Sequence, residues 1–347
     1  MKFKTITMLM LAGLLVACDN DEPTPSGGSA IQVKLEADRT ILIGAADGKI
    51  YNMEDGSVYA TLPGCAQITD MAMHGEDYYV AGYAQDNGNT YWVNGEALHI
   101  NSLYDNSLAV ARSFDHVYVL TLGQKCCLYR DNTKYAETQD ASDVVALAAY
   151  GDKFYVAGNK SAHSPALWTN SGVMELDNGG RTAHATGIDL ITSNQGVTHL
   201  ISGYQATIVD GSEVYEACMW RNGALSTLPL NVTDSEKNNH TYKSSKAFDV
   251  AHYGSKVYVT GYRSDARDRH ATVWVASAYD EDEVKTYWQA DGNVDAQAQR
   301  VLVYGSDVYV MTIERERMTN TYCTRIWMNH ELKGTVNGIV GVDFVVI

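Results

Sequence analysis

The chain has little positive charge: 26 lysines and arginines stand against 42 aspartates and glutamates, giving a formal net charge of −16. A nucleic-acid-binding protein needs a basic face that replaces counterions on the phosphates, so this balance argues against that class and against simple adhesion to anionic lipid. Only 5 prolines occur in 347 residues, and long helical patterns are scarce. Together with 23 tyrosines, these absences favour an all-β chain.

Motifs of well-known catalytic and metal sites are missing as well. The sequence contains no GxSxG, no HExxH, no phosphate-binding loop and no Rossmann glycines after a strand. Apart from Cys18 there are five cysteines, without a CxxC pair or a Cys/His zinc spacing. Cys126 and Cys127 are adjacent, so export to an oxidising compartment would permit a vicinal disulfide. Neighbouring strand residues point to opposite faces, however, and we interpret the cysteines as small buried residues.

A single hydrophobic run stands at the N-terminus. Two lysines precede the apolar residues 6–16, a stretch too short to span a membrane but typical of a signal peptide, which we place at residues 1–17. The motif LVAC, which ends at Cys18, resembles the lipobox of bacterial lipoproteins. That resemblance implies cleavage before Cys18 and lipidation of its thiol, with palmitate as a component.

The residues after Cys18 form an acidic stretch rich in proline, glycine and serine. We therefore expect residues 18–30 to be the lipidated cysteine and a flexible tether, and residues 31–347 to be the folded domain. An acidic tract directly after the cysteine resembles the surface-export signal of some Gram-negative lipoproteins. This resemblance implies an outer-membrane lipoprotein that is exposed at the cell surface.

A repeat runs through the folded domain. The segment YYVAG, which ends at Gly82, returns as FYVAG ending at Gly158 and VYVTG ending at Gly261, with weaker copies between and around them. Seven copies can be aligned with a basic period of roughly 38 residues. Each contains four short strand-like pieces separated by Gly, Asn and Asp turns, which is typical of a four-stranded antiparallel meander.

Sheets of this kind bury both faces when several of them pack radially, as in a β-propeller. The first copy lacks an innermost strand, whereas the chain ends with GVDFVVI (341–347), which has that form and nothing after it. We therefore predict an all-β, seven-bladed β-propeller of four-stranded antiparallel blades, closed by the C-terminal strand in the N-terminal blade. A solenoid with open ends is the alternative.

The recurring glycine, aromatic and tryptophan pattern resembles Kelch-like propellers and lipoprotein propellers of bacterial surfaces, over residues 31–347. Kelch repeats carry a Gly-Gly doublet, whereas the residue after the glycine is Tyr83, Asn159, Tyr204 or Tyr262 in this chain. The resemblance therefore implies a fold and no activity. The Ser-x-Asp-x-Gly-x-Thr-Trp box typical of sialidase propellers is missing too. We expect the tryptophans of the third strands to serve packing between blades rather than sugar stacking.

Charged residues recur near the start of the innermost strands. The candidates for a ring at one mouth of the channel are Asp70, Asp189, Asp249 and Asp343, with Arg300 at the matching place of another copy. One interpretation is a calcium site or a set of general acids and bases. The other is that each carboxylate accepts hydrogen bonds from backbone amides of its own or the next blade.

Long, unequal loops are expected between second and third strands, at residues 205–216, 263–270 and 314–321, and in the connection 231–245. In a propeller these connections share one face, where binding sites usually lie. The candidate ligand-binding residues there are Arg263, Arg267, Arg269, His270, Arg315, Arg317, Tyr204, Tyr262, His240 and Tyr242. Arginine suits carboxylates and tyrosine suits sugar faces, although a solvated surface of self-paired charges is the alternative.

We therefore expect a surface-anchored binding module for an extracellular glycan, acidic in our preferred hypothesis, or for a partner protein of an outer-membrane uptake system. The lipid is its expected link to the membrane, nucleic acid is not expected as a partner, and calcium is the one cofactor considered. The alternative function is a carbohydrate hydrolase or lyase that uses Asp70, Asp189 or Asp249 with His270 or His240. A structural assembly part is the third hypothesis.

Overall fold

The computed structural model describes residues 39–85, 90–100, 106–122, 126–138, 141–161, 164–194, 196–230, 243–265, 267–277, 285–289, 295–316 and 318–347. The unit from Arg39 to Ile347 is compact, and the described residues form 28 strands in seven four-stranded antiparallel sheets, with no helix. Within these ranges, accordingly, no helix is long and apolar enough to cross a membrane.

Each sheet is one blade, whose strands are named in order from the innermost to the outermost. Blade 1 contains β28 (Gly341–Val346), β1 (Ile41–Ala45), β2 (Lys49–Asn52) and β3 (Val58–Thr61). Blade 2 contains β4 (Cys65–His74), β5 (Asp77–Ala84), β6 (Thr90–Val93) and β7 (Glu96–His99). Blade 3 contains β8 (Asn106–Ser113), β9 (His116–Leu122), β10 (Cys126–Arg130) and β11 (Thr133–Thr138). Blade 4 contains β12 (Asp143–Tyr150), β13 (Lys153–Ser161), β14 (Ser164–Thr169) and β15 (Gly172–Glu175).

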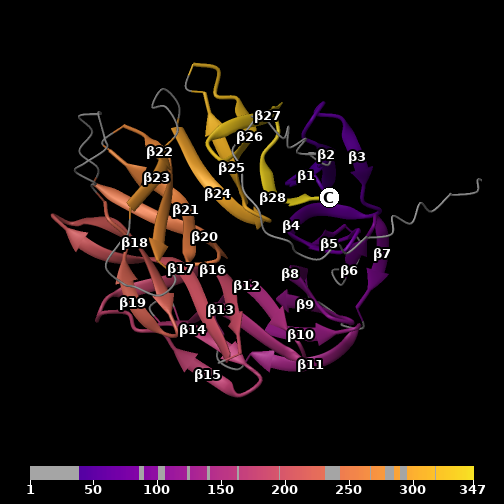
Figure 1. Cartoon of the computed structure of the whole chain (residues 1–347), viewed down its shortest axis with the longest axis horizontal. Coiled ribbons are helices and arrows are strands. Elements are labelled where there is room, and N and C mark those ends of the chain that lie inside the picture. The colour runs from indigo at the N-terminus through magenta and orange to yellow at the C-terminus, as the bar shows by residue number, and fades with distance from the viewer. Residues whose placement is uncertain are drawn as a thin grey trace, which may run out of the picture. The chain divides into compact units, whose positions relative to one another are not determined.

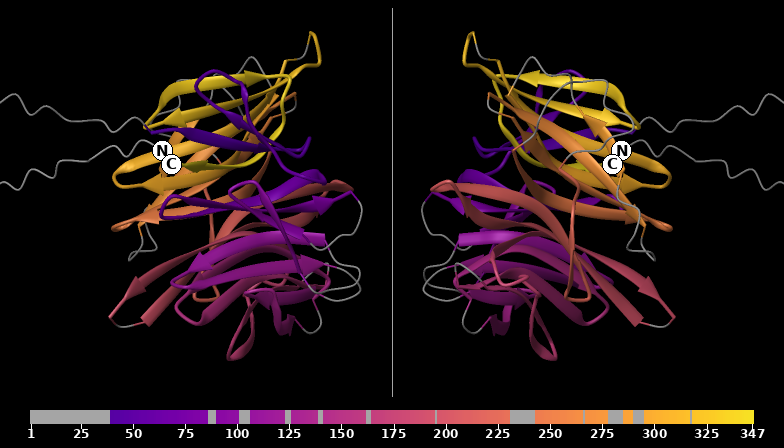
Figure 2. Two further views of the ribbon diagram at one scale, coloured as in Figure 1. Left: turned by 90° about the vertical axis from the view of Figure 1, so that its right-hand side faces the viewer. Right: turned by 90° about the vertical axis from the view of Figure 1, so that its left-hand side faces the viewer.

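The second half of the chain continues the series. Blade 5 contains β16 (Thr182–Ser193), β17 (Gly196–Val209), β18 (Ser212–Arg221) and β19 (Ala224–Thr227). Blade 6 contains β20 (Ser244–Tyr253), β21 (Lys256–Ser264), β22 (Arg269–Ser277) and β23 (Lys285–Gln289). Blade 7 contains β24 (Asp295–Tyr304), β25 (Asp307–Arg315), β26 (Tyr322–Met328) and β27 (Glu331–Asn337). The blades follow one another around a central channel, and side views show their strands running between the two faces of the ring (Figures 1 and 2).

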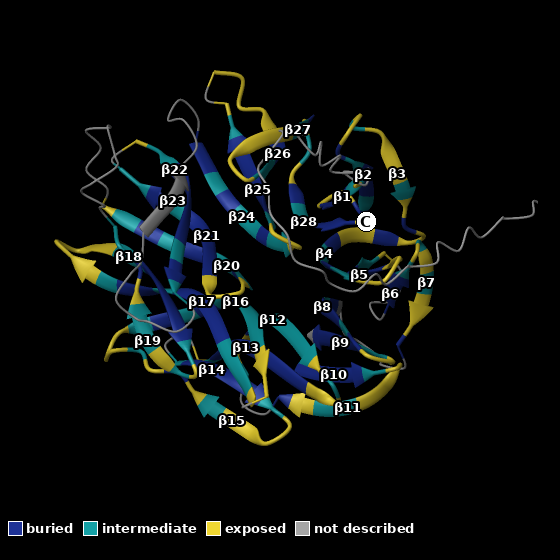
Figure 3. Ribbon diagram, viewed as in Figure 1, coloured by how far each residue is buried: buried dark blue, intermediate teal, exposed yellow. Residues whose placement is uncertain are grey.

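The two ends of the domain meet in blade 1, which confirms the predicted ring closure. The C-terminal strand β28 pairs antiparallel with β1, with Ile43 opposite Phe344 and Leu42 opposite Val345 (Figure 1). Phe344 and Val345 are both 3% exposed, so this strand is part of the core. The outermost strands, in contrast, carry much of the exposed surface of the blades (Figure 3). The fold is a seven-bladed β-propeller, as the repeat predicts.

The repeated glycine has a steric explanation. In every blade the innermost strand contains a one-residue register shift, a bulge. The bulge pushes the backbone towards the second strand: a Cβ at Gly261 would lie 1.9 Å from the carbonyl oxygen of Lys246, and one at Gly203 would lie 2.1 Å from that of His184. Only glycine fits such an approach without a backbone shift.

The repeated tryptophans lie inside the blades. Trp92, Trp220 and Trp274 are fully buried. The indole N–H of Trp92 donates to the carbonyl oxygen of Pro63 (3.0 Å) and that of Trp274 to Pro229 (3.0 Å). Both acceptors belong to the connection that arrives from the preceding blade. The tryptophans therefore tie one blade to the next, which confirms the packing interpretation and leaves these indoles unavailable to a sugar.

The five described cysteines are free thiols, and all but Cys323 are buried. Burial raises the pKa of the Cys65 thiol to about 11 and raises that of Cys218 further. Cys126 and Cys127 form no vicinal disulfide in this structure. Their burial agrees with the interpretation of these cysteines as small core residues.

Candidate functional site

The two faces of the ring differ in the connections they carry. Because neighbouring strands are antiparallel, the turns from first to second and from third to fourth strands lie on one face. We call this the turn face. The connections from second to third strands and from blade to blade lie on the other, which we call the loop face. The central channel runs between the two faces. Each face carries a group of side chains that come from different blades.

On the loop face, the ammonium group of Lys246 lies between two tyrosine rings. Its Nζ is 4.1 Å from the ring centroid of Tyr204 and 3.6 Å from that of Tyr215. The two rings meet edge to face at 5.4 Å, and His184 stacks on Tyr204 with ring centroids 5.0 Å apart. Burial lowers the pKa of Lys246, and the nearby Glu213 carboxylate opposes this shift. The cation is therefore half-buried and held by π faces.

A second basic group lies beside it, where two arginines converge on one aspartate. Arg269 donates from Nε (2.7 Å) and Nη2 (2.5 Å) to the two carboxylate oxygens of Asp295. Arg315 Nη2 lies 3.5 Å from the same carboxylate. The hydrogen bond from Arg269 lowers the pKa of Asp295, so this carboxylate is ionised at neutral pH. The Arg269 guanidinium also lies 5.8 Å from the ring centroid of Tyr262.

The innermost strands explain why these groups meet. Each side chain that lies two residues before the bulge points to the loop-face rim of the channel, and in blades 4 to 7 these are Asp143, His184, Lys246 and Gln297. We call these four residues, with Tyr204, Tyr215, Tyr262, Arg269, Asp295 and Arg315, the loop-face crescent. Sequence reasoning missed Lys246 and its neighbours on the innermost strands. A sequence pattern that could have revealed them is the polar residue that recurs two positions before the bulge in successive copies.

The crescent contains four of the residues predicted for ligand binding, namely Tyr204, Tyr262, Arg269 and Arg315. Arg263 and His270 lie elsewhere: they are 0% and 1% exposed and face the interior of blade 6. The physical reason is strand alternation, because Arg263 pairs with His270 across β21 and β22 and both point to the face opposite Arg269. A hydrogen bond of 3.2 Å joins Arg263 Nη1 to the carbonyl oxygen of Leu230.

The remaining predicted ligand-binding residues are distributed as follows. Arg267 is exposed in the turn between β21 and β22, where its backbone N–H donates to Asp265 (2.7 Å). Arg317, His240 and Tyr242 lie outside the described residues, as does the lipidation candidate Cys18. Residues 205–216, predicted as a loop, extend β17 and β18 into a hairpin that turns at Asp210 and Gly211. Alternating β-branched residues and an Asp-Gly turn favour such a hairpin over a loop.

The predicted charged ring lies inside the channel, about half-way along the strands. Asp70, Asp249, Arg300 and Asp343 each follow a bulge directly and line a cavity of about 910 Å³. Asp189 also lines this cavity but stands two residues further along its strand, because the bulge of β16 comes earlier. It accepts from His252 Nδ1 (2.6 Å), and this hydrogen bond raises the pKa of His252.

Three carboxylates of the ring join neighbouring blades. Asp70 accepts from the backbone N–H of Val110 (2.8 Å), Asp249 from Val301 (3.0 Å) and Asp343 from Met71 (2.9 Å). In each case the donor belongs to the innermost strand of the next blade. These contacts agree with the interpretation of the recurring acids as acceptors of backbone amides.

The ring also carries unusual protonation equilibria. Burial, together with the charge of Asp343 and a hydrogen bond to it, raises the pKa of Asp70 well above its ordinary value. Burial raises the pKa of Asp249 to about 6, although Arg300 opposes the shift. Arg300 Nε lies 3.6 Å from Asp343. The guanidinium also interacts electrostatically with Asp249 and Asp70, so it is the cation that partly neutralises these acids. Among the described residues, no three His, Cys, Asp or Glu side chains form a group that could hold a metal ion.

We expect Asp70→Asn to raise stability at both pH 5 and pH 8, and to raise it more at pH 8, because the loss of stability begins at the ordinary pKa of the unfolded carboxyl and continues up to the raised folded pKa. A carboxyl whose pKa is raised in the folded state favours folding while protonated, and this contribution is lost as pH rises through the folded pKa. An asparagine amide can keep both contacts of the protonated acid, accepting from Val110 and donating to Asp343. Urea unfolding at the two pH values measures the effect.

Asp343→Asn provides the matched control. Asp343 accepts from the backbone N–H groups of Met71 and Phe344, so an amide NH₂ would face a donor. We expect a loss of about 2 kcal/mol of unfolding free energy at both pH values. Equal effects of the two substitutions at pH 8 would contradict the assignment of the proton to Asp70.

No known protein-family description matches the sequence, and no curated protein matches it either. Solved structures do match the fold. A quinonprotein alcohol dehydrogenase-like protein from Bacteroides thetaiotaomicron superposes with a TM-score of 0.50 at 12% identity, over 88% of this chain and 77% of that one. Extracellular domains 1–2 of Drosophila Semaphorin 1b give 0.49 at 10% identity, over 80% and 83% of the two chains. The WD40 β-propeller domain of Doa1 gives 0.46 at 13% identity, over 83% and 88%.

At these identities the similarity concerns the fold alone. A β-propeller fits a binding module, and the same fold also carries enzymes, so the function has to be argued from the sites.

Proposed function

We propose that this protein is a binding module that takes an acidic extracellular glycan at the loop-face crescent. The observation that supports this proposal most is the half-buried Lys246 ammonium between Tyr204 and Tyr215. In this proposal a lipid on Cys18 anchors the module at the outer surface of the outer membrane. A partner protein with an acidic surface is the alternative ligand.

The charge of the crescent supports an anionic ligand. Within the described part of the chain, no carboxylate lies within 4 Å of the Lys246 amine, which is held by the two rings. Arg269 and Arg315 share the single carboxylate of Asp295. The crescent itself therefore holds three cations against the two carboxylates of Asp143 and Asp295, with Glu213 nearby, on a protein whose net charge is −16. Partial burial strengthens the attraction between such cations and a ligand carboxylate, because the local dielectric is lower than that of water.

The other side chains of the crescent suit a sugar. The Tyr204 ring is occupied by His184 and Lys246, so its role is to position the ammonium group. Tyr262 stands between Phe248 and Arg269 and is partly exposed, which leaves it as the ring for a sugar face. Asp143 and Gln297 flank the cations and offer acceptors and a donor to hydroxyl groups.

Lys246→Ala is expected to weaken the binding of polygalacturonate oligosaccharides by roughly tenfold to a hundredfold, because a half-buried charge loses its partner. Isothermal titration with the full chain measures the effect. Lys256→Ala is the matched control, since Lys256 is an exposed lysine of the same blade on the turn face. Equal affinities of wild type and Lys246→Ala would contradict the proposal, and an absence of binding to any acidic glycan would favour a protein ligand.

A carbohydrate-active enzyme is the second candidate, and the channel supports it. Asp70 and Asp249 have raised pKa values in a cavity of about 910 Å³, and a carboxyl whose pKa is raised towards neutrality can act as a general acid. His252 bonds to Asp189, another acid of the cavity, whereas His270 is buried in blade 6. Release of reducing ends during the same titrations would favour this second function.

A further inference from the structure

Exposed aromatic side chains stand at the turn-face ends of four innermost strands. Tyr150, Tyr253 and Tyr304 are the last residues of β12, β20 and β24, and they are 44%, 49% and 50% exposed. Phe114 follows β8 directly and is 63% exposed. Tyr304 also lines the central cavity, which therefore reaches this face. Neither the loop-face crescent nor the charged ring uses these residues.

Phe114 has a backbone conformation that the other blades reserve for glycine. Its φ is 48°, and the residues directly after four other innermost strands, with φ between 57° and 64°, are Gly75, Gly151, Gly254 and Gly305. A bulky residue in this left-handed region is strained. A largely exposed ring gains little packing energy in return. The conformation of this turn favours glycine, so the phenylalanine is explained neither by the turn nor by packing.

The Phe114 ring lies next to the corresponding turn of blade 4. Its centroid is 6.2 Å from that of Tyr150, with the ring planes tilted by 48°. Its Cε2 atom lies 3.7 Å from the position that a Cβ on Gly151 would take. Two blades therefore contribute one ring each to an exposed aromatic surface, which we call the Phe114–Tyr150 platform.

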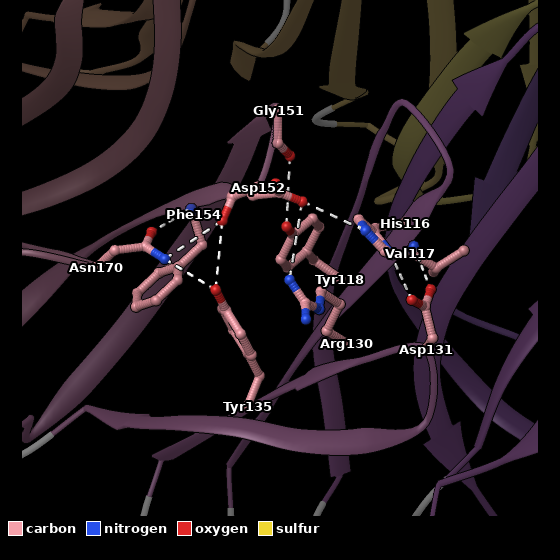
Figure 4. A network of polar contacts seen from close by, with 10 residues as sticks. All are labelled: His116, Val117, Tyr118, Arg130, Asp131, Tyr135, Gly151, Asp152, Phe154 and Asn170. Atoms are coloured by element: carbon pink, nitrogen blue, oxygen red, sulfur yellow. Dashed lines mark hydrogen bonds and ion pairs between the residues drawn. The ribbon is translucent and has the colours of Figure 1, made fainter.

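Polar contacts hold the two turns of the platform in place (Figure 4). His116 bonds through Nδ1 to Asp131 (2.6 Å), and its Nε2 lies 3.3 Å from Asp152 Oδ1 (Figure 4). The Tyr118 hydroxyl donates to the carbonyl oxygen of Gly151 (3.4 Å). Because His116 and Gly151 flank the platform in sequence, these contacts preorganise it and reduce the entropy lost on binding.

We propose that the Phe114–Tyr150 platform is a second binding site, which takes a neutral sugar ring of a polysaccharide. The C–H groups on the face of a pyranose pack against the electron-rich face of an aromatic ring. Asp115 and the 79% exposed side chain of Asp152 stand beside the platform and accept hydrogen bonds from hydroxyl groups. Asp152 is paired with His116 and lies 3.9 Å from Arg130 Nη1. The repulsion of uronates, sulfated sugars and nucleic acids therefore rests on the exposed carboxylate of Asp115. The expected ligand is therefore uncharged.

Phe114→Gly separates a role in binding from a role in folding. Glycine suits the left-handed turn, so we expect the melting temperature to stay equal to that of wild type or to rise. The probes are mannohexaose, laminarihexaose and maltohexaose, titrated into the full chain. We expect at least one of them to bind, and its dissociation constant to increase by about tenfold or more in Phe114→Gly.

Tyr150→Ala is the second variant and is expected to weaken the same probe. Tyr59→Ala is the matched control, because Tyr59 is 47% exposed and also lies 6.2 Å from another ring, that of Tyr78, but on the outermost strand of blade 1. Failure of all three probes to bind wild type would overturn the proposal. It would also be overturned by unchanged affinity in both variants, or by a lowered melting temperature of Phe114→Gly, since that result would assign Phe114 to folding.

Discussion

A chain that ends at Val340 is expected to lose cooperative folding. The missing residues 341–347 include β28, which supplies the innermost strand of blade 1 and the strand partner of β1. Burial of Phe344, Val345 and Val346, each 3% exposed, contributes about 6 kcal/mol at roughly 2 kcal/mol per side chain. The whole unfolding free energy of a domain is about 5–15 kcal/mol. The truncation also removes Asp343, which accepts the backbone N–H of Met71 in blade 2.

Urea unfolding followed by tryptophan fluorescence, together with gel filtration, measures this effect. Deletion of Ile347 alone is the control, because its side chain is 38% exposed and its removal takes away only the two backbone hydrogen bonds to Thr40 while leaving β28 in place. We expect that variant to keep a cooperative transition near that of wild type. A truncated chain with the wild-type midpoint and elution volume would show that ring closure contributes little to stability.

Gly261→Ala is expected to lower the unfolding free energy by about 3 kcal/mol. Its Cβ would lie 1.9 Å from the carbonyl oxygen of Lys246 and 2.9 Å from the Cα of Ala247, so the backbone of β20 would have to move. Overpacking of this kind typically costs about 1–3 kcal/mol, and backbone atoms yield less than side-chain ends. The midpoint of urea unfolding gives the difference.

Gly305→Ala separates this steric effect from the general cost of replacing glycine. Gly305 has a φ of 61°, and a Cβ on it would meet nothing within 4 Å. We expect a cost of about 1 kcal/mol from the left-handed conformation alone. Similar losses in both variants would mean that the contact at the bulge is not what selects glycine in the second strands. Since Gly261 lies opposite the carbonyl of Lys246, only its replacement should also weaken binding at the loop-face crescent.

The repeat and the matching of the two chain ends were sufficient to predict the fold. Both signals are local: strand-forming residues between turn residues, and a terminal strand without a partner. The position of the bulge within each repeat is harder to predict from the sequence. The sequence of the first copy offers Gly44 as the repeated glycine, whereas the structure places Ala45 at the equivalent position, opposite Gly341 and immediately before the bulge. A bulge shifts the alternation of side chains by one residue, but in a short strand that shift can be placed at several positions, so sequence alone does not locate it.

The site could be predicted only in part, for the same reason. The bulge decides that Asp70, Asp249 and Asp343 share one level of the channel while Asp189 stands two residues further along. The candidate arginines were grouped by nearness in sequence, although Arg263 and Arg269 point to opposite faces of blade 6. Lys246 was missed because its significance depends on Tyr204 and Tyr215 of the preceding blade. A contact between two blades cannot be inferred from the sequence of one repeat.

The most direct test of the central claim is a glycan array probed with the full chain and with Lys246→Ala and Phe114→Gly. Wild type is expected to bind acidic glycans, more weakly as salt screens the charges, and this signal should be lost in Lys246→Ala and kept in Phe114→Gly. Any signal on neutral glycans should be kept in Lys246→Ala and lost in Phe114→Gly. This opposite response of the two variants separates the two proposed sites. Acidic-glycan signals that are absent from wild type, or that persist unchanged in Lys246→Ala, would contradict binding at the loop-face crescent.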